Sequence, residues 1–402
     1  MPSSPAGGTG LYYSDGDCHG AVLFFLCLLD KFLRTTRSSL STTRGTPLRW
    51  WQRAQRCLRP QDMPDWRAQR DQHSPYVVEG TIRPGLEYCS HCIGETQLVV
   101  SAGATGNLGQ KLIDSLHSHG HQVRALGRNP SKLEPSRREK LESFVQSETY
   151  HDIPALDRAC KGVDTVICAY QGIPQLQLEG QLLLVRAAER ASVKTYVAHC
   201  WSYDWRNMKL GVQESYGPFV SFRNHMDLSS SLKPIYIFTG VLAEVLFSAP
   251  GHGHFSPAHN GCWDPERNTM EIWGTGEEIW HWTTERDAVE FTTAIIERDD
   301  ASQGGDWAVC SGSSTLKELA AIYGKVRHCN VDIRMKGTVE ELRERAFEAR
   351  RQGSRRNYWP YIGWFYQLHT VDGTWSLGEL DNEKLGIKTT KFDEFLREHP
   401  TL

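Results

Sequence analysis

The chain has 402 residues, a formal net charge of −3 at pH 7 and a pI near 6.6. This length is enough for one large two-lobed domain or for two domains. The balanced charge gives no general sign of a surface for nucleic acid or membranes, so neither is predicted as a partner. The 11 cysteines show no framework spacing, which predicts reduced thiols and a cytoplasmic protein.

Residues 1–95 differ from the rest and are predicted to be an N-terminal extension of low order. The apolar run at residues 21–29 is too short to span a bilayer. Acidic residues precede it where a secretory signal carries basic ones, and the basic stretch that follows is misplaced for a targeting leader. A disordered extension or an over-long gene model is favoured. Cys89 and Cys92 form a lone C-x-x-C, for which an incidental pair is favoured over a metal or redox site.

A short apolar run at residues 97–101 predicts a strand, and three glycines follow it, each separated from the next by two residues. Apolar residues then recur at helical spacing up to Leu116. A strand, a glycine turn and a helix in this order form the context of a dinucleotide-binding fingerprint. The helix N-terminus supplies free N–H groups for a pyrophosphate. The predicted cofactor contacts in this stretch are Gly103, Ala104, Thr105, Gly106, Asn107, Leu108 and Gly109.

The next predicted strand, residues 121–126, ends at a basic segment. An NAD site is expected to place an acid at this strand end, whereas an arginine there suits a 2′-phosphate. The chain has no acid there, but it has Arg128, with Asn129 and Lys132 close behind. This pattern predicts NADP(H) as the cofactor, and the alternative is that both cations are only solvated surface charges.

The segment Gly-Ala-Thr-Gly-Asn-Leu-Gly from residue 103, with Arg-Asn-Pro-Ser-Lys-Leu from residue 128, resembles the NmrA-like and isoflavone-reductase-like proteins. These are atypical short-chain dehydrogenases. The resemblance runs from about residue 96 to the C-terminus and is strong for the cofactor half. The aromatic-rich later half is similar to the fungal branch of the family.

Strands and helices are predicted to alternate through residues 96–250. The pattern predicts helices at 155–161, 175–191 and 218–232, and strands at 162–171, 193–198 and 234–238. It predicts a Rossmann-type doubly wound parallel sheet, an α/β fold with ligands at the carboxyl ends of the strands. The residues that this places near the cofactor are Asp152, Ile153, Tyr170, Gln171, His199 and Trp201.

Residues 251–402 are predicted to form a smaller α+β substrate lobe packed on the Rossmann domain. A strand is predicted at 269–274, and helices are predicted to begin near residues 284, 315 and 338. Thr315 with Glu318, and Thr338 with Glu341, have the spacing of capping boxes, which are folding signals. The dense aromatic run at 358–366 either lines an apolar substrate pocket or packs in the core.

The catalytic residues are harder to predict, because the usual Tyr-x-x-x-Lys pair is absent after the fifth strand. The resemblance implies a lysine in the helix before the sixth strand, and Arg223 occupies that place. Arginine keeps the charge but is a poor proton donor, so Arg223 is expected to hold the nicotinamide end of the cofactor or a substrate oxygen. The candidate replacement acids are His225, His199 and Tyr216.

No metal site is predicted. His252, His254, His259 and Cys262 lie in a Gly- and Pro-rich loop without the helical spacing of a metalloprotease motif.

Two functions remain open. The first is an NADPH-dependent oxidoreductase that reduces a small apolar or aromatic carbonyl or alkene. The second is a non-catalytic NADP(H) redox sensor that regulates a partner protein, as the resemblance implies for some NmrA-like members.

Overall fold

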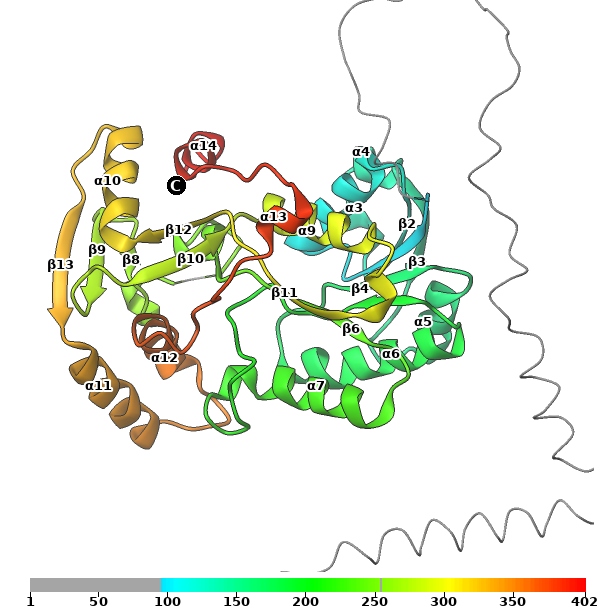
Figure 1. Ribbon diagram of the computed structural model, residues 1–402, viewed down its shortest axis with the longest axis horizontal. Helices are drawn as coiled ribbons and strands as arrows, with labels where there is room; N and C mark the ends of the chain where they lie inside the picture. Colours follow the sequence, from blue (N-terminus) through cyan, green and yellow to red (C-terminus); the bar gives the residue numbers. More distant parts are fainter. Residues whose placement is uncertain (1–94, 254) are drawn as a thin grey trace, which may run out of the picture. The chain divides into compact units, whose positions relative to one another are not determined.

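A seven-stranded sheet dominates the computed structural model, which describes residues 95–253 and 255–402 (Figure 1). The strand order is β11-β6-β5-β4-β1-β2-β3, and all neighbours are parallel. The order reverses between β1 and β4, which creates the crevice where ligands of such sheets bind. The strands are β1 Leu98–Ala102, β2 Gln122–Gly127, β3 Leu141–Gln146, β4 Thr165–Cys168, β5 Thr195–Val197, β6 Pro234–Phe238 and β11 Gly305–Ala308.

Helices cover both faces of this sheet, which confirms the predicted fold class. One face packs against the buried side chains of α3 and α9, and the other against those of α5, α6 and α7. Neighbouring residues of β1 point to opposite faces of the sheet. Val99 lies in the core beneath α3 and α9, and Val100 lies in the core beneath α5, α6 and α7. The helices are α3 Asn107–Ser118, α4 Pro135–Arg138, α5 Ile153–Cys160, α6 Gln181–Arg190, α7 Gly217–Ser229 and α9 Glu285–Ile296.

Two three-stranded sheets and several helices make up the second part of the structure. The sheets have the orders β12-β10-β7 and β13-β9-β8. Their strands are β7 Val241–Leu242, β8 Trp263–Asp264, β9 Thr269–Trp273, β10 Ile279–Thr283, β12 Gly312–Thr315 and β13 Asp332–Gly337. The helices are α8 Ala243–Leu246, α10 Leu316–Arg327, α11 Val339–Gln352, α12 Trp359–Val371, α13 Asn382–Leu385 and α14 Phe392–Glu398.

Both predicted capping boxes are present at the starts of α10 and α11. The Thr315 hydroxyl accepts a hydrogen bond from the Glu318 N–H at 3.1 Å, and Glu318 accepts one from the Thr315 N–H at 2.8 Å. Thr338 and Glu341 repeat the arrangement. The aromatic run at 358–366 forms the first turns of α12, where Tyr361 and Phe365 are buried in a core shared with α11.

The chain crosses between the two parts more than once. Helix α9 and strand β11 come from beyond residue 250, yet they pack on and extend the seven-stranded sheet. The sequence also predicts a charged helical piece at residues 137–141, and this placement is wrong. Helix α4 starts earlier, at Pro135, a favoured first helical residue, and β3 already begins at Leu141.

The predicted extension at 1–95, its apolar run and the Cys89–Cys92 pair lie almost wholly outside the described residues, which begin at residue 95. No helix in the described ranges is long and apolar enough to cross a membrane.

Candidate functional site

The turn after β1 and the first turn of α3 each contain a position where only glycine fits. Gly103 has a φ of +87°, and a Cβ there would lie 2.6 Å from the Ala169 carbonyl oxygen at the end of β4. A Cβ on Gly109 would lie 2.3 Å from the Gly103 carbonyl oxygen. These backbone contacts press the start of α3 against the turn and leave no room for a side chain.

The N-terminus of α3 is open to an anion. Gly106 is its N-cap residue and offers no side-chain acceptor, and the first turn contains no acidic residue. The first N–H groups of a helix have no partner within the helix, and together with the helix dipole they favour a bound anion. Asn107 lies at this end and donates its side-chain N–H to the Gly251 carbonyl oxygen at 3.1 Å.

The basic segment after β2 presents unpaired cations beside this turn. Arg128 and Lys132 are exposed, and neither forms an ion pair with another residue of the described ranges. Asn129 instead accepts hydrogen bonds from the N–H and hydroxyl of Ser131, at 2.9 and 2.6 Å. Its side chain therefore caps the short 3-10 turn at 130–132, and the side chains of Arg128 and Lys132 are free of ion pairs with the described residues.

The residues predicted near the cofactor from β3 and β4 differ in their roles. Asp152 caps α5, because its carboxylate accepts from the Ala155 N–H at 3.1 Å. Ile153 packs against the core, and Tyr170 is buried in it. Gln171 is exposed just beyond the end of β4.

Two of the four predicted catalytic candidates are held by partners on the flanks of α7. The Arg223 guanidinium donates two hydrogen bonds of 3.0 Å to Asp306 on β11 and lies 5.0 Å from the Tyr236 ring. The His225 Nε2 lies 3.0 Å from the Arg186 guanidinium on α6. These contacts do not support the predicted catalytic roles.

Tyr216 lies in an aromatic cluster beyond the carboxyl ends of the strands. Its ring centroid is 5.1 Å from that of Phe219 and 5.2 Å from that of Trp375. Burial raises the pKa of the Tyr216 phenol well above its usual value, so the group stays protonated.

His199 follows β5, and its ring stacks on Phe219 with centroids 5.2 Å apart. Its Nδ1 is buried and has no hydrogen-bond partner among the described residues, and burial lowers the pKa of the imidazole to about 4. Trp201 is also buried nearby, and its indole N–H donates to Thr292 at 2.8 Å.

A cavity of about 180 Å³ opens where the turn after β6 meets the second part of the structure. Its lining combines the aromatic rings of Tyr203 and Trp375 with Ile279, Val371, His281 and Gly240. Gly240 has a φ of +68°, and a Cβ there would lie 2.1 Å from the His281 carbonyl oxygen. This close approach holds β10 against the end of β6.

A model of the NmrA-like family matches residues 95–344. The chain belongs to the NmrA-like family. It is 25% identical over 212 residues to pinoresinol reductase 2 of Arabidopsis thaliana, which is 50% of this chain and 65% of that relative. The chain therefore spans just under two thirds of the length of this curated relative.

Solved structures share the fold of this NmrA-like protein at low identity. A crystal structure of isoflavone reductase has a TM-score of 0.59 and 18% identity, covering 76% of this chain and 99% of that one. The binary complex of leucoanthocyanidin reductase with NADPH from Vitis vinifera has the same TM-score with 16% identity, covering 76% and 100%.

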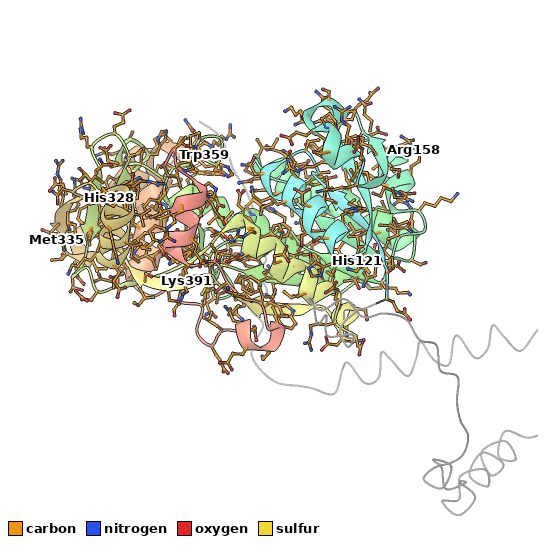
Figure 2. All side chains as sticks on the ribbon, turned by 90° about the horizontal axis from the view of Figure 1, so that it is seen from above. His121, Arg158, His328, Met335, Trp359 and Lys391 are labelled. Atoms are coloured by element: carbon orange, nitrogen blue, oxygen red, sulfur yellow. The ribbon has the colours of Figure 1, made fainter. Side chains whose placement is uncertain are left out.

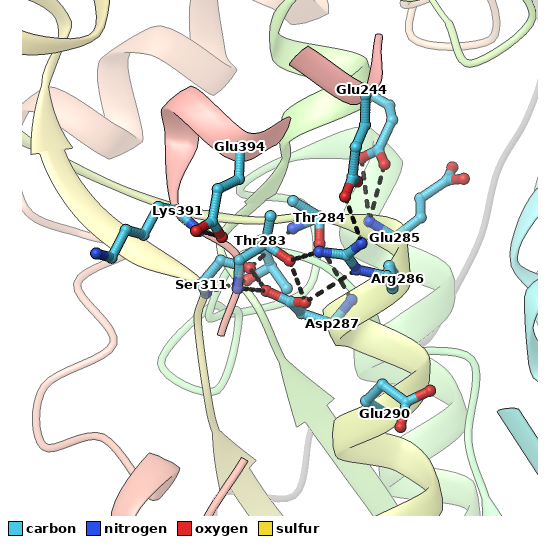
Figure 3. A network of polar contacts seen from close by, with 12 residues as sticks. Glu244, Thr283, Thr284, Glu285, Arg286, Asp287, Glu290, Ser311, Lys391 and Glu394 are labelled. Atoms are coloured by element: carbon cyan, nitrogen blue, oxygen red, sulfur yellow. Dashed lines mark hydrogen bonds and ion pairs between the residues drawn. The ribbon is translucent and has the colours of Figure 1, made fainter. Parts of the chain in front are cut away.

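A buried acidic pair lies at the N-terminus of α9 in this NmrA-like protein (Figure 3). Both Glu244 oxygens accept from the Glu285 N–H, at 3.0 and 3.1 Å. Burial and the neighbouring Glu285 charge raise the pKa of Glu244 to about 7. Burial also acts to raise the pKa of Glu285, but contacts with His252 and Lys111, both at 2.8 Å, outweigh it and lower that pKa.

The acidic pair connects to the glycine turn through His252, whose Nδ1 also lies 3.0 Å from the Asn107 side chain. The predicted absence of a metal stays a prediction, since His254 lies outside the described residues.

Sequence reasoning missed His281 as a site residue. Its Nδ1 lies 2.8 Å from the Ser313 hydroxyl on the neighbouring strand β12, and its side chain lines the cavity. Burial lowers the pKa of the imidazole, so His281 is neutral at pH 7. The only local signal was the run Trp280-His281-Trp282, in which one polar residue stands between two buried indoles.

Proposed function

We propose that this protein is an NADPH-dependent reductase that acts on a small, largely apolar or aromatic carbonyl or alkene. The observation that carries the proposal is the uncapped N-terminus of α3 behind a turn that needs Gly103 and Gly109. NADPH would supply the hydride. The backbone N–H groups of residues 103–109 would hold its pyrophosphate, and Arg128 would hold its 2′-phosphate.

The relatives support a reductase. The first relative is named a pinoresinol reductase, and a leucoanthocyanidin reductase of the same fold is bound to NADPH. The alternative of a non-catalytic sensor has less support, because a cavity adjoins the carboxyl end of β6. A protein that only senses the dinucleotide has no need of such a cavity.

The cavity supports a substrate of about one aromatic ring. Its volume of about 180 Å³ is similar to the roughly 150 Å³ that holds benzene in an engineered protein cavity. Tyr203 and Trp375 would pack on the ring of the substrate. When the Ser313 hydroxyl donates to His281 Nδ1, the Nε2 carries the hydrogen, and we assign to this N–H a hydrogen bond to a substrate oxygen.

Calorimetry with NADPH and NADH tests the cofactor assignment. Arg128→Ala is expected to weaken NADPH binding by about ten- to a hundredfold, because a charge-assisted hydrogen bond is lost, and to leave NADH binding within about twofold. Arg158→Ala, which removes an exposed arginine of α5, is the matched control. Equal losses for both carriers would contradict the 2′-phosphate assignment, and no binding of either would contradict the whole proposal.

Turnover separates the two functions. The purified chain is expected to oxidise NADPH with single-ring aromatic aldehydes or enones. Tight NADPH binding without oxidation on any member of such a panel would favour the sensor.

A further inference from the structure

The lining of the cavity beside β6 contains an acid but no lysine or arginine among the described residues. The acid is Glu278, which directly precedes β10. Helix α12 reaches the same cavity, since it runs from the exposed Trp359 (Figure 2) to Val371 in the lining. A charged ligand of this cavity would therefore meet an acid and no fixed cation.

The turn between β9 and β10 holds the Glu278 carboxylate in its ionised form. The carboxylate accepts hydrogen bonds from the Thr275 N–H at 2.8 Å, the Thr275 hydroxyl at 3.0 Å and the Gly276 N–H at 2.7 Å. Burial acts to raise the pKa of this carboxyl, but the hydrogen bonds outweigh it and lower the pKa. All three donors are neutral, so the negative charge is retained at pH 7.

Lys317 on α10 approaches the same turn but is bound to other groups. Its ammonium donates to the Glu277 carboxylate at 2.8 Å and to the Thr275 carbonyl oxygen at 2.9 Å. Glu278 itself forms no ion pair with another residue of the described ranges, so its charge is available to a ligand. An ion of opposite charge is attracted to such a carboxylate.

The candidate proton donors are poorly suited to the reduction of a carbonyl, whose oxygen must take up a proton after hydride addition. Burial lowers the pKa values of His199 and His281, so both imidazoles are neutral at pH 7. Burial also raises the pKa of the Tyr216 phenol, which opposes the release of its proton. Arg223 and His225 are held by partners on the flanks of α7. An electrophile that takes up no proton avoids this difficulty.

We propose that the protein reduces iminium cations of single-ring size, bound in this cavity beside the Glu278 carboxylate. The inference rests on the proposed NADPH-dependent reductase and adds a substrate class to it. A hydride from NADPH forms a C–H bond at the iminium carbon, and the π electrons of the C=N bond move to the nitrogen. The products are a neutral amine and NADP⁺, so charge is balanced without a proton.

The rings and the acid of this cavity both act on substrate binding. Tyr203 and Trp375 stack with ring centroids 4.3 Å apart, and aromatic rings attract cations at their faces. The positive charge of the substrate disappears as the hydride is transferred, so Glu278 stabilises the bound substrate more than the transition state. Glu278 is therefore expected to lower KM without raising kcat.

Calorimetry on the full chain without NADPH tests the preference for a cation. Benzyltrimethylammonium carries a permanent positive charge beside one ring, and 3-phenylpropionate is an anion of similar size. Wild type is expected to bind the cation at least about tenfold more tightly, because the carboxylate attracts one and repels the other. Glu278→Gln is expected to remove most of this preference. Glu266→Gln, which neutralises an exposed acid elsewhere, is the control and should keep it.

Turnover tests the reaction. N-methyl-3,4-dihydroisoquinolinium is a stable iminium with one aromatic ring, and wild type is expected to oxidise NADPH with it. Glu278→Gln should raise KM for this iminium by about tenfold without lowering kcat, because only binding of the cation is weakened. Its NADPH affinity should match that of wild type, whereas a merely structural effect would also lower kcat or NADPH binding.

The outcomes separate this inference from the proposed function. A chain that binds NADPH but does not oxidise it with the iminium would overturn the iminium assignment and leave the cofactor assignment intact. A chain that binds neither NADPH nor NADH would overturn both. Equal affinity of wild type for the cation and the anion would overturn the role of Glu278, even if Glu278→Gln fails to fold, and so would an unchanged KM in a folded Glu278→Gln.

Discussion

Arg223 and Asp306 meet through two parallel hydrogen bonds of 3.0 Å, which join α7 to the outermost strand of the large sheet. Asp306 stands next to Tyr236 in the register of β11 with β6, and the Arg223 guanidinium also lies over the Tyr236 ring. Paired guanidinium and carboxylate groups in this geometry are specific and well oriented. The arrangement gives Arg223 a structural task in the sheet.

We expect Arg223→Ala to lower the free energy of unfolding by about 1–2 kcal/mol, since a bidentate pair and a ring contact are lost. The dissociation constant for NADPH should stay within about twofold of wild type. Urea unfolding and calorimetry measure the two effects. Asp306→Ala should reproduce the loss of stability, and the double variant should cost less than the sum. If Arg223→Ala left stability unchanged but greatly weakened NADPH binding, Arg223 would be a cofactor-binding residue and not a structural one.

The second prediction concerns two glycines of the turn before α3 and its first helical turn. Substituting one should mainly lower stability, and substituting the other should mainly weaken NADPH binding. We expect Gly109→Ala to destabilise the protein by about 2–4 kcal/mol, because its Cβ would meet backbone atoms that cannot move aside. Among the described residues, a Cβ at Gly106 would approach only the Gly103 carbonyl oxygen, at 3.3 Å. Gly106→Ala should therefore change stability by less than about 1 kcal/mol but weaken NADPH binding, since the methyl group fills the approach of the pyrophosphate. Unaltered NADPH affinity in Gly106→Ala would argue against an anion at this turn.

Local patterns predicted the parts of this protein that depend on neighbours in sequence. The strand, turn and helix around Gly103 and the capping boxes at Thr315 and Thr338 are of this kind. Each depends on residues within a few positions of one another, so the sequence carries the whole signal.

Contacts between distant segments were not predictable in the same way. The return of β11 to the large sheet, the partner of Arg223 and the place of His281 each depend on residues tens of positions away. The family position of a lysine suggested a catalytic role for Arg223, but the acid that binds it lies 83 residues further along the chain. A single sequence gives no sign of such a pair.

The buried acidic pair makes stability depend on pH in a defined window. The pKa of Glu244 is raised from 4.5 to about 7, so the unfolded chain ionises this group first as the pH rises. The unfolded state then binds fewer protons than the folded state, and stability falls between pH 4.5 and about 7. We expect Glu244→Gln to remove this fall, because an amide oxygen still accepts from the Glu285 N–H. Chemical unfolding at several pH values measures the difference.

The groups around Glu244 do not explain the expected difference between wild type and Glu244→Gln. They either titrate outside this pH window or are present in both proteins. Glu285, with its lowered pKa, affects stability below pH 4.5, and Lys111 and His252 remain in Glu244→Gln. Glu139→Gln, at an exposed position, is the control and should keep the wild-type profile. A profile of Glu244→Gln that parallels wild type would mean that Glu244 is ionised in the folded protein at these pH values.

The cavity beside β6 gives the last prediction, which separates substrate binding from cofactor binding. Val371 lines the cavity from the end of α12 and is only partly buried, so a larger side chain can enter the space. We expect Val371→Trp to lower kcat/KM for a single-ring substrate by at least about tenfold, since an indole would occupy most of the volume that a ring needs. NADPH affinity should not change, because Val371 lines the cavity beside β6 and is not among the residues of the turn at Gly103. Steady-state kinetics and calorimetry on the same preparation provide both values. Retained kcat/KM in Val371→Trp would place the substrate elsewhere, whereas a joint loss of turnover and NADPH binding would show that the variant disturbs the fold around β6.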